Sequence, residues 1–206
     1  MLASRFFTPD RRKRREQSLV IPFTPEWRAA KARLQKARQY VVTAMADPTD
    51  DDARWLAGAA AAGDEDHARW ELRYARMSIG VFVAERDALD DRTGSDVVAA
   101  LHEALAADER IAPDLRLLAE RQLSDRMQGY REAFHSRGGA AGTGEKLGRV
   151  LLSFASDGAR SAGTPLARAV SVLSGYVLDC NAALRDAYGT ASLPEHLPPS
   201  EVATKS

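Results

Sequence analysis

The fold is decided by residues 65–91, which read EDHARWELRYARMSIGVFVAERDALDD. Apolar side chains recur there at alternating steps of four and three, and further apolar residues lie beside them: Trp70, Tyr74, Met77, Val81, Ala84 and Ala88, then Leu72, Ile79, Val83 and Leu89. This spacing predicts a central helix that is buried over a wide face. Gly80 costs this helix about 1 kcal/mol relative to alanine, so we expect it to permit a close crossing with another helix.

Capping residues and glycines indicate where the other helices begin and end. Thr24-Pro25 and Thr164-Pro165 each place a good N-cap residue before a proline at the first helical position. Thr49, with Asp52 three residues later, approximates a capping box. Together with glycines that follow apolar-periodic stretches, these signals predict helices over 25–46, 50–62, 65–91, 95–107, 113–136, 145–160 and 165–188.

The composition also favours helices. The chain has 206 residues and contains 37 alanines but only three isoleucines and one asparagine. Alanine and arginine rank high in helix propensity, whereas isoleucine, valine and threonine rank high for strands. Five of the 29 basic residues are lysine, a bias typical of a GC-rich, bacterial-like genome. We predict an all-α protein, an antiparallel bundle of about seven helices preceded by a disordered or extended N-terminal arm.

The sequence divides into five segments. Residues 1–23 form a basic extended arm, 24–137 the main helical bundle, 138–144 a glycine-rich connector, 145–189 a C-terminal helical hairpin packed on the bundle, and 190–206 a flexible tail. The last predicted helix carries a narrow apolar seam of the kind used in helix pairing: Leu166, Val170, Leu173, Val177, Cys180, Leu184 and Tyr188. We expect this helix to run antiparallel to the preceding one.

Zero net charge hides a strong polarity along the chain. Residues 1–40 contain 11 basic and 3 acidic residues, whereas residues 41–125 contain 9 basic and 19 acidic residues. The arm combines clustered cations with apolar anchors and supplies the predicted partner-binding residues: Phe6, Phe7, Arg11, Arg12, Lys13, Arg14, Arg15 and Phe23. This asymmetry favours either a protein partner or docking of the arm on the chain's own acidic middle region. Nucleic acid and an anionic membrane surface are further alternatives.

Several classes of function find no support in the sequence. The longest apolar run is far shorter than the roughly 20 residues of a transmembrane helix, and no apolar segment follows the basic N-terminus, so we expect a cytoplasmic protein. Cys180 is the single cysteine, which excludes a disulfide within the chain, and its apolar seam predicts a small buried hydrophobe. Residues 139–146 begin like a phosphate-binding loop, but Glu145 separates the last glycine from Lys146.

One pattern suggests metal chemistry. Glu132 and His135 have the Glu-x-x-His spacing that places two ligands on one helix face in di-metal bundles, and Asp64 with His67 has a similar spacing. Further candidate ligands lie on other predicted helices: Glu71, Glu85, Glu103 and His102. Both pairs fall at helix ends, where the helix dipole already explains an acidic start and a histidine at the end. The sequence therefore predicts no metal ligand and no cofactor, and a carboxylate/histidine di-metal enzyme stays an alternative.

These observations favour a non-enzymatic function. We predict a helical adaptor, regulatory or accessory subunit that binds a protein partner through its basic N-terminal arm and its apolar helix seams. The alternatives are the di-metal enzyme and a nucleic-acid-associated protein that uses the arm. The identity of the partner, any substrate and a homo-oligomeric state are left open.

Overall fold

A computed structural model describes residues 24–88, 91–135, 139–156 and 164–189. The chain divides into two units, residues 1–32 and 33–206. All regular elements of the described residues are helical, which confirms the all-α class. In chain order they are α1 (Pro25–Ala44), α2 (Asp50–Ala59), α3 (Glu65–Asp87), α4 (Asp91–Ala106), the 3₁₀ turn η1 (Pro113–Leu115), α5 (Arg116–Phe134), α6 (Gly139–Ala155) and α7 (Thr164–Tyr188). The predicted arm over 1–23 and tail over 190–206 lie outside the described residues.

Side-chain caps fix the starts of the first three helices. Thr24 Oγ1 accepts a hydrogen bond from the backbone N–H of Trp27, at 3.2 Å. Thr49 Oγ1 accepts one from the N–H of Asp52, at 3.1 Å. Both predicted helix starts are therefore confirmed. Asp64 is the N-cap of α3, because its Oδ1 accepts a hydrogen bond from the backbone N–H of His67, at 2.9 Å.

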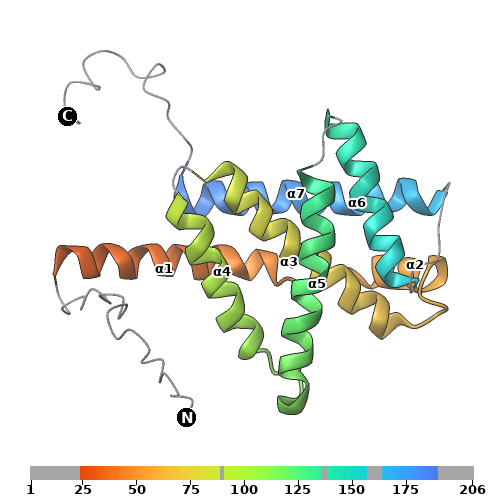
Figure 1. Ribbon diagram of the computed structural model, residues 1–206, viewed down its shortest axis with the longest axis horizontal. Helices are drawn as coiled ribbons and strands as arrows, with labels where there is room; N and C mark the ends of the chain where they lie inside the picture. The colour runs from red at the N-terminus through yellow and green to blue at the C-terminus, as the bar shows by residue number, and fades with distance from the viewer. Residues whose placement is uncertain (1–23, 89–90, 136–138, 157–163, 190–206) are drawn as a thin grey trace, which may run out of the picture. The chain divides into compact units, whose positions relative to one another are not determined.

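Helix α3 is the centre of the second unit. It contacts α2, α4, α5, α6 and α7. Its residues from Glu71 to Ala84 are buried with the exception of Arg76. The central position and wide burial predicted from the apolar spacing are thus confirmed, and Figure 1 shows α3 passing diagonally among the helices around it.

Gly80 permits the closest helix contact of α3. A Cβ atom at this position would lie 2.7 Å from Ala44 Cβ on α1 and 3.7 Å from Cys180 Sγ on α7. The hydroxyl of Tyr40 on α1 donates a hydrogen bond to the carbonyl oxygen of Gly80, at 2.6 Å. The predicted close crossing is confirmed, and it involves two helices because α1 and α7 both meet α3 at this point.

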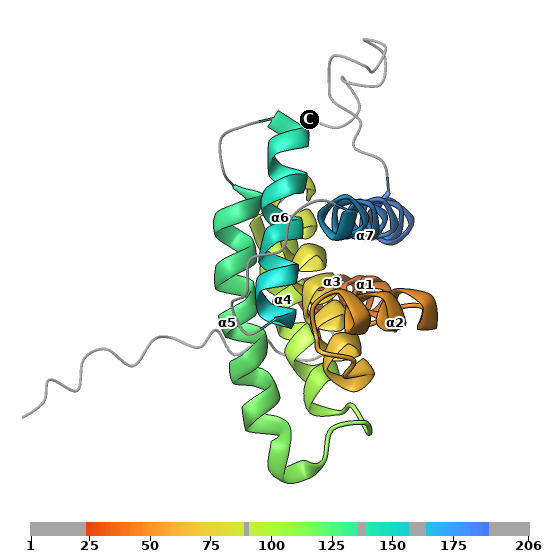
Figure 2. The ribbon, with the colours of Figure 1, turned by 90° about the vertical axis from the view of Figure 1, so that its right-hand side faces the viewer.

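The helices around α3 follow two main directions. α4, α5 and α6 alternate in direction, whereas α7 crosses α6 at a steep angle, as Figure 1 and Figure 2 both show. The predicted contact between the last two helices is present. The two helices cross steeply instead of running antiparallel, so residues 145–189 do not form the antiparallel helical hairpin that the sequence predicted.

The sequence predicted a flexible glycine-rich connector over 138–144, but the described part of this stretch is helical. Helix α6 begins at Gly139, so this glycine-rich stretch is helical from that residue onward. A Cβ atom at Gly148 would lie 3.0 Å from Leu166 Cδ1, and one at Gly144 would lie 3.3 Å from Val170 Cγ1. The two glycines let α6 approach α7 closely, and this packing outweighs the low helix propensity of glycine.

Two glycines of α6 are expected to respond differently to alanine. Gly148→Ala places a methyl group against Leu166, so the strain should cancel or exceed the gain of about 1 kcal/mol in helix propensity. Gly142→Ala should raise the free energy of unfolding by about 0.5 to 1 kcal/mol, because nothing lies within 4 Å of a Cβ there. Urea unfolding measures both, and equal stabilisation would contradict the close α6–α7 contact at Gly148.

Apolar side chains are exposed at η1 and at the first turn of α5. Leu115 and Leu118 belong to an apolar stripe in the sequence, yet both side chains are about half exposed. Leu117 beside them is 70% exposed. The buried part of the stripe begins at Ala119. In Figure 1 this turn lies at the end of α5 that is remote from α6 and α7, so neither helix covers it.

Candidate docking groove

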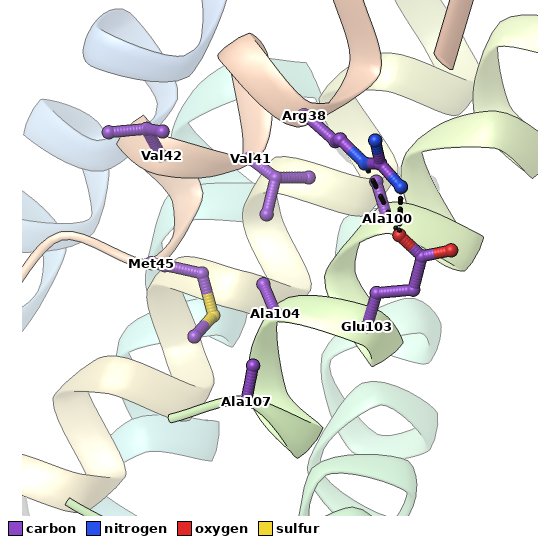
Figure 3. A pocket seen from close by; sticks show the side chains of 8 residues that line it. All are labelled: Arg38, Val41, Val42, Met45, Ala100, Glu103, Ala104 and Ala107. Carbon is purple, nitrogen blue, oxygen red and sulfur yellow. Dashed lines mark hydrogen bonds and ion pairs between the residues drawn. The ribbon is translucent and has the colours of Figure 1, made fainter. Parts of the chain in front are cut away.

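An apolar groove lies between the C-terminal half of α1 and α4, within the second unit (Figure 3). It has a volume of about 490 Å³ and is lined by Arg38, Val41, Val42, Met45, Ala100, Glu103, Ala104 and Ala107. Figure 3 shows Val41 and Met45 directed toward the alanines of α4, with Arg38 and Glu103 meeting at one end. The volume falls in the range of about 300 to 1,000 Å³ typical of binding pockets.

Helix geometry explains why α1 exposes an apolar side chain at this groove. The buried residues of α1 are Ala37, Tyr40, Val41 and Ala44, which repeat at steps of three and four. At about 100° per residue these four side chains cover an arc of roughly 100° with Val41 at its edge, and Val42 lies about 100° beyond that edge, outside the buried face. Val41 is 3% exposed and Val42 is 72% exposed.

Small side chains on α4 form the opposite wall. Ala100 and Ala104 are four residues apart and lie on one face of α4, and Ala107 follows directly after the helix ends at Ala106. Alanine contributes only a methyl group, which leaves open space between this face and α1. At one end of the groove Arg38 Nη2 donates to Glu103 Oε2 at 2.9 Å, and both side chains are 55% exposed. Such an exposed pair adds at most about 1 kcal/mol to stability.

At the other end, a buried charge network joins the segments that follow α1 and α4. Arg73 on α3 is 3% exposed, and its Nη2 donates to Asp108 Oδ2 at 2.6 Å. Its Nε lies 3.3 Å from Asp47 Oδ1 but without hydrogen-bond geometry. Arg110 donates from Nη1 to Asp47 at 2.6 Å and from Nε to Asp108 at 2.8 Å. The Arg73 guanidinium also stacks 4.4 Å from the ring centroid of Trp70.

This network joins the segments that follow α1 and α4 to α3. Asp47 lies three residues beyond the end of α1, and Asp108 lies two residues beyond the end of α4. Because Arg73 and Arg110 contact both carboxylates, the C-terminal ends of the two helices are tied to the same pair of guanidinium groups. Separating Asp108 from α3 would leave the buried Arg73 without its buried carboxylate, which costs several kcal/mol, whereas the contacts of Asp47 are half exposed and contribute less. The network therefore holds the segment after α4 firmly on α3 and the segment after α1 more weakly.

The network makes stability depend on pH. Burial alone would raise the pKa of Asp108, but hydrogen bonds from Arg110 and Arg73 outweigh it and hold that pKa well below its ordinary value. Ionised Asp108 thus stabilises the fold fully above the unfolded carboxyl pKa of about 4, and this contribution is lost as the pH falls below it. We expect the stability difference between wild type and Asp108→Asn to shrink from pH 7 to pH 3 in urea titrations. A constant difference would contradict the low pKa.

The sequence-predicted partner-binding residues are not among the described residues. All eight lie in residues 1–23, so the structure places none of them. The apolar seam of α7 was expected to serve helix pairing, and Leu166, Leu173, Cys180 and Leu184 are indeed buried among the other helices of this chain. These four residues pack within the fold, whereas Val170, Val177 and the 70% exposed Leu178 line a second apolar hollow beside α7.

The candidate metal ligands are not brought together. Glu132 and His135 are both exposed near the end of α5, and Asp64 is the N-cap of α3. The other carboxylates bind arginines: Glu71 with Arg126, Glu85 with Arg131 and Glu103 with Arg38. Within the described ranges, no group of three or more histidine, cysteine or acidic side chains is placed to hold a metal ion.

Cys180 is a buried side chain of the α7 seam, as its sequence position predicts. It is fully buried, and burial raises the pKa of its thiol to about 11. A thiol with this pKa is almost entirely protonated at neutral pH, so it is a poor nucleophile. The residue contributes packing at the crossing of α1, α3 and α7.

The groove residues were missed from the sequence, although two signals point to them. Val42 lies outside the apolar face that Ala37, Tyr40, Val41 and Ala44 form at steps of three and four. Ala100, Ala104 and Ala107 recur at helical spacing in and directly after α4. Neither signal shows that the two faces lie opposite each other, because that arrangement depends on how α1 and α4 pack on α3.

Comparison with models of protein families, with curated proteins and with solved structures found no match. Among the described residues, no helix is both long enough and apolar enough to cross a membrane. The groove therefore has to be interpreted from its own geometry and chemistry.

Proposed function

We propose that this protein is a non-enzymatic helical adaptor, regulatory or accessory subunit that binds a protein partner in the cytoplasm. The observation that carries the proposal is the apolar groove between α1 and α4, with Val42 72% exposed at its edge. A single exposed valine is ordinary, but an apolar side chain beside an open apolar hollow is typical of interaction sites. The buried charge network supports this interpretation, since a preorganised site loses less entropy on binding.

The basic arm is the second part of the proposal. Its clustered cations and phenylalanines suit an acidic surface of the partner, and α1 continues the charge with three cations and no acidic residue from Arg33 to Ala44. Deleting residues 1–23 should weaken partner binding and leave the melting temperature unchanged. A large fall in the melting temperature would instead indicate that the arm covers the chain's own acidic region.

Native mass spectrometry of the protein purified from its own cells tests the proposal. We expect a complex with another polypeptide in the wild type and loss of that complex in Val42→Gln. Glutamine is a good helix former, so this exposed change should alter stability by no more than about 0.5 kcal/mol.

Leu117→Gln is the matched control, because Leu117 is 70% exposed and lies on α5 outside the groove. The control should keep the complex. If the wild type carries no partner, or if both variants lose it equally, the groove is not the docking site.

A further inference from the structure

A second apolar hollow, of about 500 Å³, lies beside the middle of α7 (the α7 hollow). Its walls come from the ends of α3 and α5, the start of α6 and α7 itself. The lining is mainly apolar: Phe134, Leu147, Val170, Leu173, Val177 and Leu178. Leu178 is 70% exposed, and a large exposed apolar side chain beside an apolar hollow is typical of a surface that another segment covers.

The end of α7 lies within reach of this hollow. The α7 residues in the lining extend from Val170 to Leu178, and the helix ends at Tyr188. Gly189 has a φ of +86°, and its N–H donates to the carbonyl oxygen of Arg185 at 2.7 Å, which is the left-handed turn that ends many helices. Measured back along the helix axis from Gly189, Leu178 is about 16 Å away.

The sequence after Gly189 favours an extended backbone. Residues 193–199 read LPEHLPP, so Leu193 and Leu197 each precede a proline. Proline cannot continue a helix, and it biases the residue before it toward extended or polyproline II conformation. In polyproline II the chain rises about 3.1 Å per residue with three residues per turn. Pro194 and Leu197 would then share one face of the segment.

This face matches the α7 hollow in length. If the chain turns at Gly189 and runs back along α7, Pro194 lies about 15 Å and Leu197 about 25 Å from the turn. On α7, Leu178 lies about 16 Å and Leu173 about 24 Å from the same point. Pro194 therefore reaches the exposed edge of the hollow, and Leu197 reaches its middle.

Tethering favours the chain's own segment over a separate molecule. A short linker holds its end at an effective concentration in the millimolar range, so weak apolar contacts suffice for docking. The wall of the hollow also contains the aromatic ring of Phe134. Aromatic walls are typical of grooves that bind proline-containing extended segments.

We propose that residues 193–198 fold back along α7 and cover the α7 hollow, with Pro194 beside Leu178 and Leu197 beside Leu173. This surface is distinct from the groove between α1 and α4, so the inference does not rest on the proposed function.

Disulfide trapping in the full-length protein tests the inference. The test pair is His196→Cys with Ser174→Cys, because Ser174 lines the hollow and both positions lie about 22 Å from Gly189. Cys180 can stay, since it is fully buried and burial raises the pKa of its thiol to about 11. Peptide mass spectrometry after mild oxidation measures the rate at which the intrachain disulfide forms.

The control pair is His196→Cys with Gly175→Cys. Gly175 is the next residue, so its distance from Gly189 is almost the same, but it lies about 100° further around α7 and lines a different hollow. A Cβ atom there has nothing within 4 Å. We expect the test pair to form its disulfide about tenfold faster or more than the control pair. Adding Pro194→Gln and Leu197→Gln to both pairs should bring the two rates together.

Three outcomes overturn the inference. Equal rates in the test and control pairs show that the segment does not lie on this side of α7. Disulfides that form only between two molecules show that the segment of a second copy reaches the hollow instead. A rate difference that persists after Pro194→Gln and Leu197→Gln shows that these two side chains do not hold the segment in place.

Discussion

Asp108→Asn should lower the free energy of unfolding by about 3 to 5 kcal/mol, the largest effect that we expect from any single substitution. The Asp108 side chain is 4% exposed, and its Oδ2 accepts a hydrogen bond from Arg73 Nη2 at 2.6 Å. Asparagine has nearly the same shape but no charge, so the one carboxylate left in contact with the buried Arg73 among the described residues would be Asp47, at 3.3 Å. For a chain of this length the loss corresponds to a fall in melting temperature of about 6 to 20 °C.

Glu103→Gln is the control for Asp108→Asn. It breaks the ion pair with Arg38, in which both side chains are 55% exposed, and should cost less than about 1 kcal/mol. Adding Arg73→Met to Asp108→Asn removes the unpaired buried charge, so the double variant should recover part of the loss. If Asp108→Asn and Glu103→Gln are equally stable, the network does not hold the ends of α1 and α4.

Gly80→Ala should lower the free energy of unfolding by about 2 kcal/mol, although alanine is the better helix former. The new Cβ would lie 2.7 Å from Ala44 Cβ, an atom that has no rotamer to move away. The backbones of α1 and α3 must therefore separate, which also strains the 2.6 Å hydrogen bond from Tyr40 to the Gly80 carbonyl. Thermal and urea unfolding measure the change.

Gly175→Ala is the matched control, because Gly175 lies in the middle of α7 and a Cβ there has nothing within 4 Å. It should raise stability by about 0.5 to 1 kcal/mol. Ala44→Gly should rescue Gly80→Ala in part, since it removes the clashing methyl group. Stabilisation by Gly80→Ala, or no rescue by Ala44→Gly, would contradict the close crossing of α1 and α3.

Local patterns predicted the elements well where each signal acts within one helix. The caps at Thr24 and Thr49 are hydrogen bonds between residues three positions apart in the sequence. Their formation therefore depends on local sequence and not on how the helices pack. The apolar spacing of residues 65–91 predicted the burial of α3 because a helix with two apolar faces must be covered on both. The glycines of residues 138–144 misled the prediction, since their low helix propensity says nothing of a close neighbour.

The sequence by itself determined an all-helical protein, the central position of α3 and the close contact at Gly80. These follow from side-chain periodicity and from the absence of a Cβ atom, which are local properties of the chain. Only the tertiary structure decided that α6 crosses α7 on Gly144 and Gly148 and that a groove opens beside Val42. The groove requires α1 and α4 to be packed on α3 and tied through Arg73, and a contact between residues so distant in sequence is set by packing geometry.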